Sequence, residues 1–166
     1  MTEKELERKI VTLASRLRLF ARKLLGDDTY VDDVIQNVLL KTWKQLSSGM
    51  SILNMEAFLM RSIRNECLDW NKSFHSKHIA TTEDITRNET AGKNLEDTIQ
   101  EKDAVQKLGE YMMNIPENQR CAIVLKDYMG YDTKEIALMM GTSEDAVRQA
   151  LSRGRKELRN RFIKEV

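Results

Sequence analysis

The last helical stretch of the chain carries polar side chains whose types and spacing suit contact with DNA. At about 100° per residue they share one helix face, and they are Arg148, Gln149, Ser152, Arg153 and Lys156. Arginine, glutamine and serine can hydrogen-bond to base edges in a major groove, and arginine and lysine can hold backbone phosphates. The same face could instead be the solvated side of an ordinary bundle, so its surroundings must decide.

The residues before this face are typical of two helices joined by a tight turn. Residues 133–162 read TKEIALMMGTSEDAVRQALSRGRKELRNRF. Thr133 is a candidate N-cap of the first helix, and Gly141 can take the left-handed conformation that ends it. Ser143 is the candidate N-cap of the second helix, whose first turn is acidic, as the helix dipole favours. The pattern predicts a helix-turn-helix and favours DNA contact over a merely solvated face.

The composition predicts an all-α protein without a membrane-spanning segment. The 166 residues include a single proline, and helix formers dominate. No apolar run approaches the ~18 residues of a membrane span, and the polar first ten residues are unlike a signal peptide. Cys67 and Cys121 lie inside helical patterns, which indicates buried, reduced thiols rather than a disulfide. We therefore expect a cytoplasmic protein with no direct membrane insertion.

Helical periodicity divides the chain into two small domains. Residues 1–75 form the first domain, and residues 101–166 form the second, which ends in the helix-turn-helix. Residues 76–100 lose the periodicity and are polar and acidic, which predicts a flexible linker. The expected helices before the helix-turn-helix cover about residues 3–25, 30–46, 55–73, 99–114 and 116–129, with Asn54 as a cap and Pro116 as a first helical residue.

The charge distribution bears on how DNA could be bound. The net charge is only +1, although the residues from Ala146 onward carry 7 Lys or Arg against 2 Asp or Glu. A protein that gripped DNA alone through its phosphates would usually be far more basic. If DNA is the ligand, another molecule must supply much of the affinity.

Three segments then occur in a recognisable order. Residues 27–46 read DDTYVDDVIQNVLLKTWKQL, and residues 57–70 read AFLMRSIRNECLDW. They resemble the signature helix and the promoter-melting helix of the bacterial sigma factors of RNA polymerase. IPENQR at 115–120, followed by the segment from Gly130 to Arg159, is similar to their carboxy-terminal helix-turn-helix. The chain length, and the passage from the first block to the last through a linker, resemble the extracytoplasmic-function (ECF) group.

The resemblance implies roles for the first domain. Asp33, Gln36 and Asn37 would bind the clamp coiled coil of the largest subunit of core RNA polymerase. The loop 47–54 and the next helix would capture the opened −10 strand of promoter DNA, because a separated strand exposes base edges and faces that amides and cations can hold. The helical pattern puts Arg61, Arg64, Asn65, Asp69 and Lys72 on the outward side of that helix. The implied −10 contacts among them are Arg61, Asn65, Asp69 and Lys72.

The resemblance also implies roles for the second domain and further partners. Arg148, Gln149, Ser152 and Arg153 match the positions that read the −35 element, and Lys156 would contact a phosphate. An anti-sigma factor, often membrane-bound, would mask both domains. A tether of about 25 residues reaches roughly 25–30 Å, and promoter elements two helical turns apart lie ~70 Å from each other. The polymerase surface would therefore have to stretch the linker.

Other interpretations remain open from the residues alone. A stand-alone helix-turn-helix regulator would need its own dimer surface and more positive charge. A metal or redox enzyme could use Cys67, His75 and His78, but their spacing matches no strong zinc pattern. A purely structural helical adaptor would leave the mixed Arg, Gln and Ser face unexplained. No phosphate loop and no nucleophilic triad stands out, so we expect no catalysis, no cofactor and no metal site.

Overall fold

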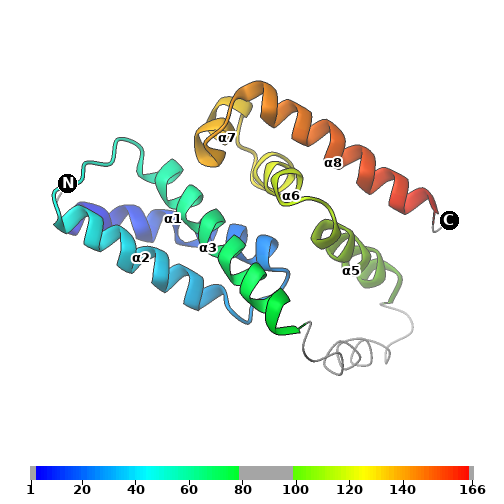
Figure 1. Ribbon diagram of the computed structural model, residues 1–166, viewed down its shortest axis with the longest axis horizontal. Coiled ribbons are helices and arrows are strands. Elements are labelled where there is room, and N and C mark those ends of the chain that lie inside the picture. The colour runs from blue at the N-terminus through cyan, green and yellow to red at the C-terminus, as the bar shows by residue number, and fades with distance from the viewer. Residues whose placement is uncertain (1–2, 79–98, 165–166) are drawn as a thin grey trace.

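The computed structural model describes residues 3–78 and 99–164, and within these ranges every regular element is helical (Figure 1). The elements are α1 (Glu3–Leu25), α2 (Val31–Ser47), α3 (Met55–His78), α5 (Ile99–Asn114), α6 (Glu117–Ile123), η1 (Val124–Tyr128), α7 (Thr133–Met140) and α8 (Glu144–Lys164). The all-α prediction is confirmed. Helix α3 is longer than predicted, so residues 76–78 are helical rather than linker. The remaining linker prediction, over 79–98, lies outside the described residues.

The first three helices form a bundle around an apolar core. Helices α1 and α2 pack against each other and against α3, and their fully buried side chains include Leu17, Phe20, Leu24, Val34, Val38, Leu59 and Ile63. Burying each such side chain contributes about 1.5–3 kcal/mol relative to leaving it in water. Gly26 ends α1 with a φ of 91°, and its N–H donates to the carbonyl of Arg22 at 2.8 Å.

The N-cap of the first helix of the helix-turn-helix lies one residue earlier than predicted. Asp132, not Thr133, is the N-cap of α7, because Asp132 and Glu135 form a reciprocal capping box. Gly141 ends α7 in the left-handed conformation, with a φ of 66°, as predicted. The hydroxyl of Ser143 accepts from the N–H of Ala146 at 3.1 Å, so the predicted cap of α8 is confirmed.

The helix before the helix-turn-helix is shorter than predicted and ends in an irregular turn. Pro116 is the N-cap of α6 rather than its first residue. Helix α6 ends at Ile123, and the chain continues as one π-helical turn, η1. Such turns occur as single insertions inside helices, and here the turn ends at Tyr128, just before Gly130 (φ 79°).

The two domains pack against each other along α3. In Figure 1, α3 runs through the middle of the molecule, with α1 and α2 on one side and the second domain on the other. Helix α3 contacts α1, α2 and α7, and a continuous set of buried apolar residues extends from the first domain into the second. Within the described ranges no helix is long and apolar enough to cross a membrane.

Candidate nucleic-acid interface

The predicted base-reading face of α8 is solvent-exposed along its whole length. All five of its predicted residues, Arg148, Gln149, Ser152, Arg153 and Lys156, are exposed. The opposite face of α8 is buried through Val147, Ala150, Leu151 and Gly154, and it packs on α6 and α7. The amphipathic pattern therefore fixes the rotation of α8 and leaves its polar face exposed to solvent.

Arg148 is held by acidic residues of its own helix. Its Nη1 donates to Asp145 Oδ1 at 2.8 Å, and its Nη2 lies 3.8 Å from Glu144 Oε1. Exposed pairs of this kind contribute about 1 kcal/mol or less. Releasing the guanidinium for a base contact is therefore inexpensive.

The basic residues in the next turns of α8 have two different surroundings. A polar hollow of about 490 Å³ is lined by Asn114, Pro116, Gln119, Arg153, Lys156, Glu157, Asn160 and Arg161. The Glu157 carboxylate accepts from Arg161 at 3.1 Å, and Arg153 and Lys156, with the neighbouring amides, suit a backbone phosphate. Arg155, by contrast, donates from Nε and Nη2 to the two carboxylate oxygens of Asp127, at 3.1 and 2.6 Å, and so joins α8 to η1.

The predicted −10 residues follow one exposed side of α3. Arg61, Asn65, Asp69 and Lys72 are all exposed, and their spacing of three or four residues keeps them on a common face. Arg61 is already engaged: its Nη2 donates to the carbonyl of Leu138 in α7 at 2.6 Å. Its guanidinium lies so close to Gly141 that a Cβ there would sit 3.3 Å from Arg61 Cζ.

Arg64 does not face solvent, although the helical pattern placed it on the outward side of α3. Only 17% of its side chain is exposed. Its guanidinium binds both carboxylate oxygens of Glu117, at 2.6 and 2.8 Å, and its Nη1 donates to the carbonyl of Met140 at 2.9 Å. Arg61 and Arg64 thus both bind carbonyls at the end of α7, where a helix has unpaired acceptors and a partial negative charge.

A second polar contact joins the domains near the start of α3. The Tyr131 hydroxyl donates to Glu56 Oε1 at 2.5 Å, Arg16 Nη1 donates to the same oxygen at 3.1 Å, and the Arg16 guanidinium lies 5.3 Å from the Tyr131 ring centre. Burial, followed by the bond to Glu56, raises the pKa of Tyr131 to about 12, so the phenol stays a donor at neutral pH. No local pattern signals these partners, because Arg16 is 40 residues from Glu56 and Tyr131 is 75 residues from Glu56.

The predicted polymerase-binding residues of α2 differ in exposure. Asp33 and Gln36 are exposed, whereas Asn37 is half-buried and its amide donates to Glu66 Oε1 at 3.1 Å. Lys41 donates to the other oxygen of Glu66 at 2.8 Å. Burial alone would raise the pKa of Glu66, but the bonds from Lys41 and Asn37 outweigh it and lower that pKa below its ordinary value.

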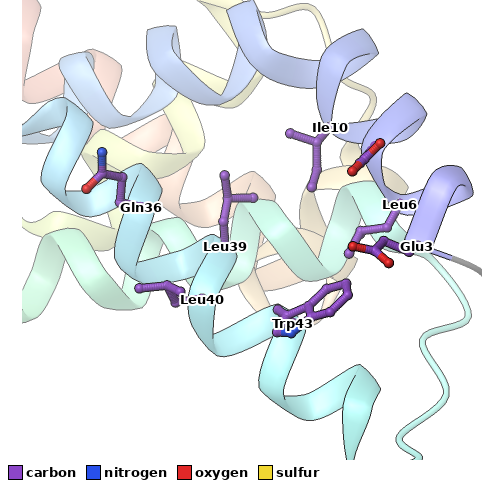
Figure 2. Close-up of a pocket in the computed structure, with 8 residues that line it drawn as sticks. Glu3, Leu6, Ile10, Gln36, Leu39, Leu40 and Trp43 are labelled. Atoms are coloured by element: carbon purple, nitrogen blue, oxygen red, sulfur yellow. The ribbon is translucent and has the colours of Figure 1, made fainter.

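An apolar groove lies beside Gln36, between α1 and α2 (Figure 2). It encloses about 470 Å³, and Figure 2 shows Leu39, Leu40 and Trp43 of α2 on one side with Leu6 and Ile10 of α1 on the other. Leu40 is 58% exposed and Trp43 is 42% exposed. An apolar patch with an adjoining polar rim is typical of a protein-binding surface.

The two cysteines are structural. Both are free and buried, and burial raises the pKa of each thiol to about 12. In the part of the chain that the structure describes, no group of three His, Cys, Asp or Glu residues could hold a metal ion. The side chains of His75 and His78 lie outside that part.

Comparison with known proteins agrees with this arrangement. Residues 10–73 match the family described as Sigma-70 region 2, and residues 106–158 match Sigma-70, region 4. The chain is 28% identical over 143 residues to the ECF RNA polymerase sigma factor SigM of Mycobacterium tuberculosis, covering 86% of this chain and 69% of that one. It is 24% identical over 144 residues to the RNA polymerase sigma factor SigZ of Bacillus subtilis, covering 86% and 78%.

Two solved structures share the fold. One is the sigma factor RpoE of Bartonella quintana in complex with the anti-sigma factor NepR, with a TM-score of 0.63, 20% identity and coverage of 95% of this chain and 96% of that one. The other is CnrH in complex with the cytosolic domain of CnrY, with a TM-score of 0.69, 19% identity and coverage of 99% and 92%.

A region 2 helical domain followed by a region 4 helix-turn-helix defines a sigma-70-type initiation factor of bacterial RNA polymerase. The chain belongs to the ECF group of these factors. It is an alternative sigma factor that directs transcription initiation, and it is not an enzyme.

Proposed function

We propose that the two domains divide the work of promoter recognition at the residues predicted from the sequence. Residues 1–75 dock on core polymerase and open the −10 element, and residues 101–166 read the −35 element as duplex. The observation that carries this proposal is the full exposure of the polar face of α8, opposite a face that the domain buries. Arg148, Gln149, Ser152 and Arg153 then meet base edges, and Lys156 meets a phosphate.

Core polymerase binds the exposed side of α2 in this proposal. Asp33 and Gln36 offer a carboxylate and an amide, and the adjoining groove offers exposed Leu40 and Trp43. A helical coiled coil with basic and apolar residues on one face complements this surface. Its apolar residues would be buried against Leu40 and Trp43, and its basic residues would pair with Asp33 at the rim. Asn37 contributes by orienting Glu66 rather than by direct reach.

The −10 strand binds α3 after the domains separate. Asn65, Asp69 and Lys72 are exposed, whereas Arg61 is bonded to α7. Promoter elements about two helical turns apart lie ~70 Å from each other. The packed arrangement of α3 against α7 is incompatible with such a separation, so α7 and the rest of the second domain move away from α3 on the polymerase.

An anti-sigma factor that contacts both domains would preserve the packed arrangement. The similar sigma factor RpoE has been solved with the anti-sigma factor NepR, and CnrH has been solved with the cytosolic domain of CnrY. The chain presents apolar surface for this contact at the groove between α1 and α2. We place the protein in the cytoplasm, where RNA polymerase acts.

The decisive experiment titrates the purified chain against bacterial core RNA polymerase and then transcribes a pool of random promoters with the resulting holoenzyme. We expect tight binding and transcription from a subset of sequences that shares two spaced elements. Specific binding to duplex DNA by the chain alone, with no affinity for core polymerase, would instead identify a stand-alone helix-turn-helix regulator. Gln36→Ala should weaken binding to core polymerase, and Lys4→Ala, at an exposed site outside the groove and the α2 face, is the matched control.

A further inference from the structure

The apolar groove between α1 and α2 has an acidic edge. Glu3 and Glu7 of α1 line it together with Leu6 and Trp43, and Figure 2 shows Glu3 beside both of these apolar side chains. Both carboxylates are exposed, and none of the ion pairs found in residues 3–78 and 99–164 includes either of them. Among the described residues, no lysine or arginine lines the groove. The groove therefore suits an apolar segment that carries positive charge.

The end of α8 presents such a segment. Ile163 is 65% exposed, and Phe162 is still 36% exposed although its ring packs edge-on against Tyr111, with 5.1 Å between the ring centres. Arg159 and Lys164 flank this apolar pair and are exposed, and in the described part of the chain neither forms an ion pair. The helix dipole favours cations in a last turn, but it does not account for the two apolar side chains beside them.

Both helix ends lie outside the segments that match the sigma family. The region 2 match begins at residue 10, after Glu3 and Glu7, and the region 4 match ends at residue 158, before Arg159. Helices α1 and α8 nevertheless continue through these residues. None of the residues that the proposed function assigns to polymerase or promoter DNA lies on these two helix ends.

The two helix ends are too far apart to meet within one molecule. In Figure 1 the start of α1 and the end of α8 lie at opposite ends of the longest axis. A contact between them therefore requires a second copy of the chain. Two copies placed antiparallel can form the contact twice, which closes the assembly as a symmetric dimer instead of an open chain.

We infer that the chain forms a reciprocal dimer in which the end of α8 of each copy occupies the α1–α2 groove of the other. The apolar pair of α8 covers the exposed apolar side chains of the groove, and the two cations of α8 pair with the two carboxylates of α1. The contact covers Leu40 and Trp43, which the proposed function assigns to core polymerase, so the dimer and the holoenzyme exclude each other. The inference goes beyond the proposed function and does not depend on it, because the two copies associate without polymerase.

Two charge-reversal variants test the contact. Glu3→Lys/Glu7→Lys makes the edge of the groove basic, and Arg159→Glu/Lys164→Glu makes the end of α8 acidic. In sedimentation equilibrium without polymerase, the unmodified chain should change from monomer to dimer as its concentration rises. Each variant alone should raise the dissociation constant of the dimer more than about tenfold, because like charges then face each other.

An equimolar mixture of the two variants gives the sharpest measurement. Their heterodimer contains one contact with the native charges and one contact with both charges reversed, so both contacts are complementary. We expect the mixture to dimerise with a dissociation constant within about threefold of that of the unmodified chain. Such a recovery also excludes misfolding as the cause of the loss in each variant. Lys9→Glu/Lys134→Glu reverses two exposed cations outside both surfaces, and as the matched control it should leave the dimer unchanged.

Three results would overturn the inference. The first is an unmodified chain that stays monomeric up to about 1 mM. The second is a dimer that persists equally in both variants, which would place the contact elsewhere. The third is a mixture that dimerises no better than its two components. Core polymerase should convert the dimer into a one-to-one holoenzyme; if the dimer forms but polymerase binds no sigma factor at all, the proposed function fails while this inference stands.

Discussion

The guanidinium of Arg64 in α3 and the carboxylate of Glu117 in α6 form a bidentate ion pair between the two domains, at 2.6 and 2.8 Å. The side chains are only 17% and 21% exposed, and the same guanidinium also binds the carbonyl of Met140. Fork-to-fork geometry of this kind is among the stronger polar contacts in proteins. The pair therefore holds the first domain against the second at a defined position.

Replacing Arg64 with alanine should loosen the packing of the two domains. The change leaves Glu117 partly buried without its partner, at a cost of about 1–3 kcal/mol. In small-angle X-ray scattering, the radius of gyration of the free chain should rise above the value of about 15 Å for a compact chain of this length. Arg18→Ala, which removes an exposed ion pair with Asp32 inside the first domain, is the control. Identical scattering from both variants would show that the pair does not hold the domains together.

Alanine substitution of two helical glycines should change stability in opposite directions. A Cβ at Gly154 would lie 2.7 Å from Ile123 Cδ1 and 3.1 Å from Gln119 Cβ, so Gly154→Ala requires the buried Ile123 side chain or α8 itself to shift. The expected cost is about 1–3 kcal/mol, despite the better helix propensity of alanine. At Gly109 no atom lies within 4 Å of the added Cβ, so Gly109→Ala should stabilise by about 0.5–1 kcal/mol. Urea unfolding measures both, and the same sign for both would contradict the observed contact between α6 and α8.

Arg148 and Lys156 should differ in how they affect DNA recognition. Arg148→Ala should cost about 1–3 kcal/mol on the selected −35 sequence and relax discrimination at one base position. Lys156→Ala should weaken binding on all sequences and lower the salt slope by about 1. Competition binding of holoenzyme against a library varied at the −35 element measures both effects. A uniform loss with Arg148→Ala would show that it contacts the backbone instead.

The lowered pKa of Glu66 predicts a stability contribution that acid removes. Because the folded pKa lies below the ordinary value of about 4.3, the contribution is fully present above that value and is lost as the pH falls through the folded pKa. Lys41→Met should destabilise by about 1 kcal/mol at pH 7, since Lys41 is two-thirds exposed. The difference from the unmodified protein should shrink below about pH 4 in urea titrations. A difference that stayed constant with pH would exclude Glu66 as the partner responsible.

The thiols should be unreactive while the protein is folded. Cys67 and Cys121 are buried, and burial raises the pKa of each to about 12. At pH 8 almost no thiolate forms, so a disulfide reagent should label neither thiol in buffer and both in urea. Rapid labelling of the native protein at the rate of a free thiol would mean that this part of the core opens readily.

Local chemistry explains why so much of the fold was predictable. Gly141 and Ser143 mark the turn of the helix-turn-helix because left-handed backbone and hydroxyl capping depend on neighbours within four residues. Thr133 was the wrong cap because two adjacent residues could cap, and Glu135 completes the box only with Asp132. The turn η1 was missed since a π-helical insertion shifts the apolar pattern by only one residue.

The contacts between the domains could not be predicted from the sequence, because the residues that form them are far apart in the chain. Helical periodicity assigned Arg64 to the outward side of α3, and with respect to its own bundle that is correct. The second domain then covers that side. The groups that bind Arg64 there, the Glu117 carboxylate and the Met140 carbonyl, lie 53 and 76 residues after it in the sequence. Among the predicted −10 residues, Arg61 bonds to α7 through a backbone carbonyl, which no side-chain pattern can indicate.

The bond from Arg61 to Leu138 has a thermodynamic consequence for affinity. One guanidinium cannot cap α7 and hold a promoter strand at the same time, so the two states compete for it. If only the separated state binds the strand, the apparent dissociation constant is the intrinsic one divided by the fraction of separated molecules. Each 1.4 kcal/mol that favours the packed state then weakens binding tenfold, and whatever separates the domains raises affinity for promoter DNA without touching it.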